Sequence, residues 1–309
     1  MKRAIEKILT NCFNIRPNTK ILIVTDSKML KIAKNFYDIA KEISFHSYLI
    51  SMKPRKRDGE EPPKKIADLI KNSDIVLAIT SKSLTHTKAA IEACRKGVHI
   101  ASMPNLSKFS ITKGGLLADY KIVSKLCKKM LKKVSNSKNI KIISENGTNI
   151  EFSVEGREWK VDEGLFLEKP KLGNLPAGEV FVAPLENSVN GTIVFDFFEL
   201  AKGKIKLEIG RGKVIKLMGK APKLLKIFQT LGSKARQIAE FGIGCNPKAK
   251  IIGNSLEDEK VFGTVHLALG NNIGFGGKNK VDFHKDGIIK KPTVIVDGKI
   301  LIEDGKWKI

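Results

Sequence analysis

Two histidines and three acids in the C-terminal half of the chain have side chains of the types that bind metal ions. His284 and Asp286 are two positions apart, so their side chains would point to the same side of an extended segment. His266 lies in an otherwise apolar run, and a buried imidazole needs a hydrogen bond or a metal ion at its ring nitrogens. Glu179 stands between a turn and an apolar run. Glu240 follows a predicted helix and precedes a glycine-rich segment.

Imidazole and carboxylate ligands together suit zinc, cobalt, manganese or iron. Two carboxylates beyond a His-His-Asp set would be enough for two ions. Each residue also has a plainer interpretation: a histidine in a strand is more often hydrogen-bonded in a core, and a glutamate at a helix end is usually solvated. No pair of histidines four residues apart fixes the geometry. The spacing alone leaves a metal site and a set of structural roles both open.

The elements that must position these residues belong to the second of two segments with different patterns. Up to about residue 135, short apolar runs alternate with helical patterns, which predicts a parallel sheet covered on both faces. Its predicted strands are residues 20–26, 45–50, 74–80 and 98–102, and its predicted helices are residues 62–71, 83–96 and 115–134. After about residue 138, short strands are separated by Gly, Asn and Pro turns, which predicts antiparallel pairing.

The predicted strands of the second segment are residues 139–144, 149–154, 179–184, 192–195, 204–209 and 213–217, with one helix at about 222–237 and a terminal hairpin. We therefore predict an α/β N-terminal domain with a small parallel sheet, followed by an α+β domain rich in antiparallel sheet. The first would be a Rossmann-like domain at residues 1–137. The second would be a metal-binding catalytic domain at residues 138–309.

Charge is the most prominent feature of the composition. The formal net charge of the 309 residues is +24, and only 8 of the 56 basic residues are Arg. Arg is preferred for bidentate recognition of phosphates and bases, whereas Lys is a strongly hydrated point charge. The composition therefore favours a solvated lysine surface, with a nucleic-acid partner left open. Aromatic residues, at 6%, are too few for a base-stacking platform.

The cysteines and the N-terminus bear on the compartment. The four cysteines have no C-x-x-C spacing, so neither a disulfide framework nor a zinc ribbon can be read from them. The N-terminus alternates charged and apolar residues instead of forming a secretory apolar core, and no window of about 18 apolar residues exists. These features predict a cytoplasmic protein with no membrane partner.

Four C-terminal segments resemble a known family in order, residue types and flanking glycines. They are Leu175–Val180, Ala239–Pro247, Glu257–Gly270 and His284–Asp286. They resemble the thermophilic metallo-aminopeptidase family that includes aminopeptidase T and aminopeptidase S, of the leucyl aminopeptidase-like kind. The resemblance implies a homodimeric, cytoplasmic hydrolase of peptides.

The resemblance also implies a site. The metal ligands would be Glu179, Glu240, His266, His284 and Asp286. They would hold one or two divalent ions, zinc or cobalt, and a metal-activated water would attack the peptide carbonyl. Glu240 would be a catalytic ligand, and a nearby acid, Glu257 or Glu259, would be the general base, with Glu259 as our candidate. We thus predict a metal-dependent aminopeptidase that removes N-terminal residues from peptides.

Two departures keep other functions open. Family peptidases place a tyrosine seven residues after the His266 position, where this chain has Ile273, which can neither bind a metal nor stabilise an oxyanion. The chain is also shorter than typical members. The first alternative is a mononuclear Fe(II) ring-cleaving dioxygenase of the related dihydroxypyridine type, with His266, His284 and Asp286 as the facial triad. The second is a basic nucleic-acid-binding protein with an idle metal site.

Overall fold

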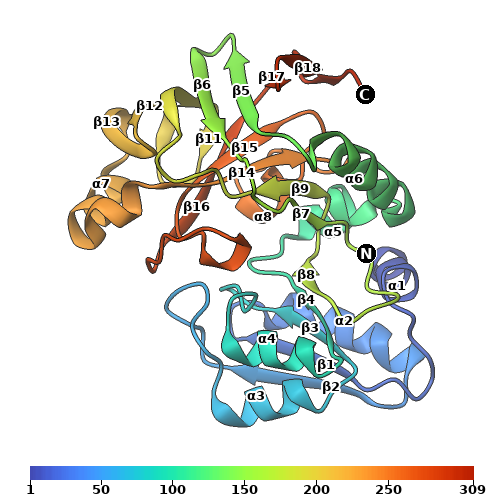
Figure 1. Ribbon diagram of the computed structural model, residues 1–309. Helices are drawn as coiled ribbons and strands as arrows, with labels where there is room; N and C mark the ends of the chain where they lie inside the picture. The colour runs from blue at the N-terminus through green and yellow to red at the C-terminus, as the bar shows by residue number, and fades with distance from the viewer. The chain divides into compact units, whose positions relative to one another are not determined.

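The computed structural model describes residues 1–309, which group into two compact units (Figure 1). The first unit comprises residues 1–124 and 162–177, and the second comprises residues 125–161 and 178–309. The chain passes between the units three times, after residues 124, 161 and 177. The domain boundary at residue 137 assumed a single passage, and it stays a prediction.

The first unit is built on a parallel sheet of five strands in the order β2-β1-β3-β4-β8. These strands are β1 (Ile21–Asp26), β2 (Ser47–Met52), β3 (Ile75–Ile79), β4 (His99–Ser102) and β8 (Leu172–Asn174). The helices are α1 (Lys2–Asn11), α2 (Leu30–Ile43), α3 (Lys64–Lys71), α4 (Lys88–Arg95), α5 (Lys108–Thr112) and the short η1 (Gly115–Leu117). Every residue of β1 and β3 is buried, which is why these strands read as continuous apolar runs. The predicted small parallel sheet is confirmed.

The second unit contains α6 (Tyr120–Val134) from residue 125 onward and two larger sheets. The eight-stranded sheet has the order β13-β12-β10-β6-β5-β17-β18-β19. Its strands are β5 (Asn139–Ser144), β6 (Thr148–Ser153), β10 (Asn190–Phe195), β12 (Lys202–Gly210), β13 (Lys213–Lys220), β17 (Thr293–Val296), β18 (Lys299–Glu303) and β19 (Lys306–Trp307). All of its neighbouring strands pair antiparallel.

The six-stranded sheet has the order β11-β16-β15-β14-β9-β7. Its strands are β7 (Lys160–Asp162), β9 (Glu179–Val182), β11 (Phe197–Phe198), β14 (Ile238–Gly244), β15 (Val265–Gly270) and β16 (His284–Ile289). From β9 to β11 its neighbours pair antiparallel, so the predicted domain rich in antiparallel sheet is confirmed. The remaining elements are α7 (Pro222–Leu231), α8 (Ser255–Asp258), η2 (Gly232–Arg236) and η3 (Ile273–Phe275).

One face of the six-stranded sheet forms an apolar core. Phe241 of β14 and Leu267 of β15 are paired across the strands and are fully buried. Phe152 and Trp159 pack edge-on against the Phe241 ring, with ring centroids 5.3 and 5.9 Å away. Burying each such side chain contributes about 1.5–3 kcal/mol. This core fixes the strand positions, so the opposite face of the same strands is held rigidly.

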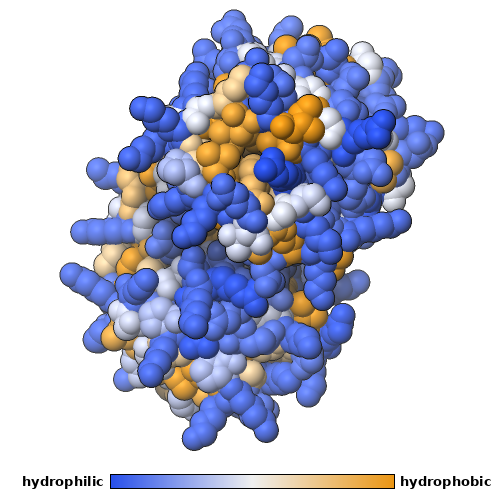
Figure 2. All heavy atoms as spheres, turned by 90° about the vertical axis from the view of Figure 1, so that its left-hand side faces the viewer, coloured by the Kyte–Doolittle hydropathy of each residue, from blue (hydrophilic) through white to orange (hydrophobic).

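The surface agrees with the lysine-rich composition. On the face drawn in Figure 2, hydrophilic side chains cover most of the surface, with apolar patches between them. Among the helices of this chain, none combines the length and the apolar character that crossing a bilayer requires. The homodimer, the cytoplasmic location and a nucleic-acid partner stay predictions.

Candidate metal centre

Four neighbouring strands of the six-stranded sheet carry the five side chains with metal-binding chemistry. Glu179 is on β9, Glu240 on β14, His266 on β15, and His284 and Asp286 on β16. Side chains alternate between the two faces of a strand, so residues two apart share a face. In the register of the sheet, Glu240 and Asp286 both lie opposite Ala268 of β15, and all five side chains point away from the apolar core.

The prediction that Glu240 stands at a helix end was wrong. The preceding helix α7 ends at Leu231, and Glu240 lies in the middle of β14. The segment from Glu240 to Gly244 alternates polar or small residues with Phe241 and Ile243, which is the pattern of a strand with one apolar face. The sequence contains this alternation, but its two glycines weaken the strand pattern.

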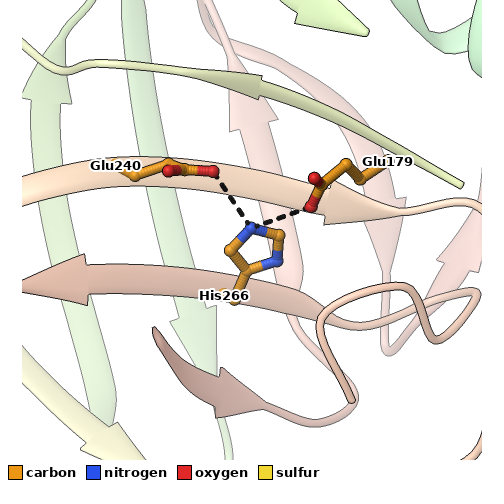
Figure 3. Close-up of side chains that lie close together, drawn as sticks. All are labelled: Glu179, Glu240 and His266. Carbon is orange, nitrogen blue, oxygen red and sulfur yellow. Dashed lines mark ion pairs between the residues drawn. The ribbon is translucent and has the colours of Figure 1, made fainter. Parts of the chain in front are cut away.

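His266 lies between two carboxylates, as Figure 3 shows. Its Nε2 is 3.4 Å from Glu179 Oε2 and 3.5 Å from Glu240 Oε1. The His266 side chain is buried, and neither ring nitrogen has a hydrogen-bond partner. A buried polar atom without a partner carries a desolvation cost that is normally compensated. The imidazole is therefore placed for a ligand that the protein itself does not supply.

The spacing of these atoms fits a bound ion better than a hydrogen bond. Good N–H···O bonds span about 2.7–3.2 Å. Two donor atoms that each lie about 2.1 Å from one ion are about 3.0 Å apart at a right angle and about 3.4 Å apart in a tetrahedron. The separations of 3.4 and 3.5 Å around His266 Nε2 are close to these values and longer than a good hydrogen bond. The side chains present thus fit a divalent metal ion.

A second group of donors shares Glu240 with the first. His284 Nε2 is 3.3 Å from Glu240 Oε2 and 3.6 Å from Asp286 Oδ1. The donor atoms of each group lie within 4.8 Å of one another. The first group is Glu179, Glu240 and His266, and the second is Glu240, His284 and Asp286. The two oxygens of Glu240 face the two different imidazoles. All five predicted ligands are thus brought into one cluster, and their assignment as ligands stays a prediction.

The His284 ring is oriented by a hydrogen bond behind it. Its Nδ1 lies 2.8 Å from the backbone carbonyl oxygen of Asn271. A carbonyl only accepts, so Nδ1 carries the hydrogen and donates it. This directs Nε2 at Glu240 and Asp286, and its lone pair becomes available to an ion once that nitrogen loses its proton. Metal-binding histidines commonly have such a partner on the second nitrogen. The Phe275 ring packs edge-on against the imidazole at 5.7 Å and further restricts its rotation.

Burial and charge act in opposite directions on the two histidines in the metal-free protein. Burial disfavours the charged form of His266, but Glu240, Glu179 and Asp286 outweigh it and raise the pKa of His266 to about 9. Burial likewise opposes protonation of His284, and Asp286 and Glu240 raise its pKa well above the ordinary value. Both imidazoles are therefore protonated at neutral pH until an ion displaces the protons.

The acids of the cluster are held ionised by the same contacts. Burial works against ionisation of Glu240, yet contacts with His266 and His284 lower its pKa below the usual value. Burial also opposes ionisation of Asp286, and His284 together with His266 holds the pKa of that carboxyl far below its usual range. Ionised carboxylates are the form that binds metal ions.

Glu259, the predicted general base, lies beside the cluster but is not in either group of donors. Its Oε1 is 2.6 Å from Lys260 Nζ. Burial raises the pKa of Glu259 to about 8, against the opposing charge of Lys260. Its catalytic role stays a prediction. Lys260 itself is fully buried and also contacts Glu179, and no sequence argument had assigned it a role.

Small residues between the ligands give the cluster its room. Gly242 lies directly opposite His266 across β14 and β15, and a Cβ atom added there would overlap the His266 ring. We expect Gly242→Ala to push the imidazole aside and lower divalent-metal affinity by about 10–100-fold, as outer-shell changes at metal sites do. Calorimetric titration of the metal-free protein with Zn²⁺ would measure it.

The matched control for this substitution is Gly210→Ala on β12. A Cβ there would meet only the flexible Ile215 side chain, at 3.3 Å or more. That variant should bind Zn²⁺ like the wild type. Equal affinity of the Gly242→Ala and wild-type proteins would mean that the His266 ring is not a metal ligand in this position.

Comparisons with known proteins bear on the chemistry of this centre. A family model described as 2,5-dihydroxypyridine 5,6-dioxygenase (NicX) matches residues 1–308. The solved structure of 2,5-dihydroxypyridine dioxygenase from Pseudomonas putida KT2440 is similar, with a TM-score of 0.82 and 16% identity over 99% of this chain and 96% of that one. Wild-type AmpT from Thermus thermophilus has a TM-score of 0.74 and 16% identity over 100% of this chain and 98% of that one. No curated protein matches the sequence.

These findings correct the predicted activity. The likeness to AmpT agrees with the resemblance to the aminopeptidase T family, but at 16% identity it is a likeness of fold. The family whose model spans almost the whole chain is one of dioxygenases, so the prediction of an aminopeptidase, a hydrolase acting in proteolysis, was wrong. The physical reason is that histidine and carboxylate side chains serve hydrolytic and oxidative metal chemistry alike. Ile273, in place of the peptidase tyrosine, was the sequence feature that pointed away from hydrolysis.

Proposed function

The chain belongs to the 2,5-dihydroxypyridine 5,6-dioxygenase family, and from that premise we propose that it is an Fe(II)-dependent dioxygenase that cleaves a hydroxylated aromatic ring. One observation supports the metal dependence above the others. The buried His266 ring has no hydrogen-bond partner on either nitrogen, and its Nε2 lies 3.4–3.5 Å from two carboxylates. Without an ion, the two carboxylates stabilise this ring only in its protonated form, whereas an ion would engage Nε2 and the carboxylates together.

The residues that would hold the ion in this proposal are His266 from one group of donors and His284 and Asp286 from the other, with Glu240 shared between the two groups. Two imidazoles and one carboxylate form a facial set that leaves coordination positions open, the arrangement of non-haem Fe(II) oxygenases. Iron bound there would supply the redox chemistry by which dioxygen reacts with an electron-rich ring. The sequence predicted zinc or cobalt, whereas we propose iron. Both assignments require a divalent metal ion at this site.

The chain's own residues orient this set. The Asn271 carbonyl holds His284 Nδ1 at 2.8 Å, so that the ring presents Nε2 to the centre. Glu240 directs Oε1 toward His266 and Oε2 toward His284, at 3.5 and 3.3 Å, and so keeps both imidazoles aimed at one region. Burial of His266 and Glu240 excludes water from their part of the cluster, while the His284 side chain is 28% exposed. Exclusion of water strengthens every electrostatic interaction inside the site.

Glu240 is also the candidate acceptor for a substrate proton. Contacts with His266 and His284 hold its pKa below the usual value in spite of burial, so it is ionised at neutral pH. A ring hydroxyl that approached the metal centre would meet this carboxylate, which can accept its hydrogen bond and its proton. Ionisation makes the ring more electron-rich and hence easier to oxidise.

The test is oxygen consumption by iron-loaded protein. Metal-free protein is loaded with Fe(II) without air and mixed with 2,5-dihydroxypyridine in air-saturated buffer. We expect oxygen uptake and loss of the ring's ultraviolet absorption in equal molar amounts. Zinc-loaded protein is the matched control and should do neither, because Zn²⁺ has no redox chemistry. Iron-loaded protein that leaves dihydroxypyridines and dihydroxybenzenes unchanged would overturn the proposed activity.

A further inference from the structure

The second unit has a cavity outside the candidate metal centre. Its volume is about 530 Å³, and none of the five candidate metal ligands lines it. Its walls are the loop after β14, the turn before β15, the link from β16 to β17 and the turn between β18 and β19. Binding sites for small molecules have volumes of about 300–1,000 Å³. The cavity is therefore large enough for a ligand of that class.

Hydrogen bonds and a close contact between two turns hold the walls of this cavity in place. In the loop after β14, the Asn246 side chain accepts a hydrogen bond from the backbone N–H of Ala249 at 3.2 Å. In the turn between β18 and β19, the backbone N–H of Gly305 donates to the Pro292 carbonyl at 2.9 Å. A Cβ atom on Gly263 would lie 2.5 Å from the Gly305 carbonyl oxygen, so these two turns touch. The cavity is thus preorganised, which lowers the cost of binding a ligand.

Four lysines line this cavity, namely Lys250, Lys290, Lys291 and Lys306. All four are exposed, and none of them forms an ion pair with an acid. One acid, Asp304, also lines the cavity, so four lysines against one acid leave a net charge of +3. Like charges that lie together without partners repel one another, and a multivalent anion would relieve that repulsion. Lysine binds phosphate groups as a point charge.

An aromatic side chain stands among these lysines. Phe262 lines the cavity and is 37% exposed. Its ring lies against the Trp307 ring, with centroids 4.4 Å apart and planes tilted by 31°. This contact holds the Phe262 ring in place, and its exposed part can stack against a planar group. Ile251 and Val261 continue the apolar lining beside it.

We propose that this cavity binds a nucleotide, with the base on Phe262 and the phosphates among the four lysines. The aromatic wall alone would suit any flat apolar ring, and the lysines alone would suit any multivalent anion. A ligand that carries a flat ring and several phosphate charges in one molecule uses both features. The site shares no side chain with the proposed metal centre, so it does not depend on the proposed activity.

The experiment follows tryptophan fluorescence while ATP is added to the full-length protein. Trp307 lies against Phe262, whereas the second tryptophan, Trp159, packs against Phe241 in the apolar core. We expect a saturable fluorescence change in the wild type and none in Trp307→Phe, which should still bind ATP by calorimetry. Inorganic triphosphate should bind at least about 10-fold more weakly than ATP, because it has no base to stack. It chelates metal ions as ATP does, and so controls for removal of metal from the protein.

Two variants separate the two halves of the site. Lys250→Gln combined with Lys306→Gln should weaken ATP and triphosphate alike, by about 10-fold, because both ligands lose charge contacts. Phe262→Leu keeps apolar bulk without a ring, so it should weaken ATP by about 10-fold and leave triphosphate unchanged. The matched control is Lys223→Gln combined with Lys226→Gln. These lysines are exposed on α7, outside the cavity, and this variant should bind both ligands like the wild type.

Three results would overturn the inference, and none of them bears on the metal centre. Triphosphate that binds the wild type as tightly as ATP would show that no base is recognised. An equal loss of ATP affinity in the α7 control would mean that ATP responds to the overall charge and not to this cavity. Absence of saturable ATP binding in the wild type would remove the site altogether.

Discussion

Replacing His266 by alanine is expected to abolish both metal binding and oxygen consumption. The imidazole is buried and faces Glu179 and Glu240, so its loss removes a ligand and leaves two carboxylates that repel one another. Loss of an outer-shell partner at a metal site lowers affinity by about 10–100-fold, and loss of a ligand should exceed that range. We expect Fe(II) affinity to fall by more than about 100-fold on this basis.

The measurement for His266→Ala is iron content per chain after anaerobic loading and desalting, followed by oxygen uptake with 2,5-dihydroxypyridine. His46→Ala is the control, since His46 is exposed in the first unit and should keep both properties. Iron content and oxygen uptake both preserved in His266→Ala would show that the centre described here is not the reactive one.

The affinity of the metal-free protein for divalent ions should rise steeply with pH. The pKa of His266 is raised to about 9 and that of His284 well above its ordinary value, because the nearby carboxylates outweigh burial. An ion must displace each of these protons, and each displaced proton makes affinity rise about tenfold per pH unit below the pKa. Between pH 6.5 and 8.5 the affinity should therefore increase by at least about 100-fold.

Zn²⁺ titrations over this pH range, with a competing chelator of known protonation, would check this expectation. In Glu240→Gln the pKa of His266 should fall because it loses a negative neighbour, and the slope should become shallower. An affinity that does not change with pH in the wild type would mean that the imidazoles are already neutral in the metal-free protein.

The same pKa shift predicts the stability of the metal-free protein. A histidine whose pKa is raised on folding contributes stability that is fully present below its unfolded value of about 6.5. For His266, that contribution is lost as pH rises through about 9. Metal-free protein should thus melt at a lower temperature at pH 9 than at pH 6.5. A bound metal ion should remove this difference in melting temperature, because it replaces the proton on His266.

The sequence by itself determined the class of both halves. Continuous apolar runs such as Ile21–Asp26 and Ile75–Ile79 must be buried on both faces, which requires a parallel sheet with covering helices. Alternation and Gly-Asn-Pro turns determined the antiparallel character of the rest. The short strand Leu172–Asn174 was missed. Three residues have too little pattern to read, and the strand exists because it pairs with β4, about 70 positions away in the chain.

The types of the site residues were also readable, since His266, His284 and Asp286 stand out in apolar or extended segments. Their mutual distances were not, because they depend on the register of four strands far apart in the chain. The same side-chain types serve peptide hydrolysis and ring oxidation, so residue types led to the wrong activity. The whole-chain family match corrected it.

Only the tertiary structure revealed that Lys260 is buried beside the acids of the candidate metal centre. In the sequence it is one of 48 lysines and directly follows Glu259. In the fold it is fully buried, with Glu179 brought from 81 positions away onto its ammonium. A sequence gives the charge of a side chain, but the cost of burying that charge and the partner that compensates it depend on how the chain packs.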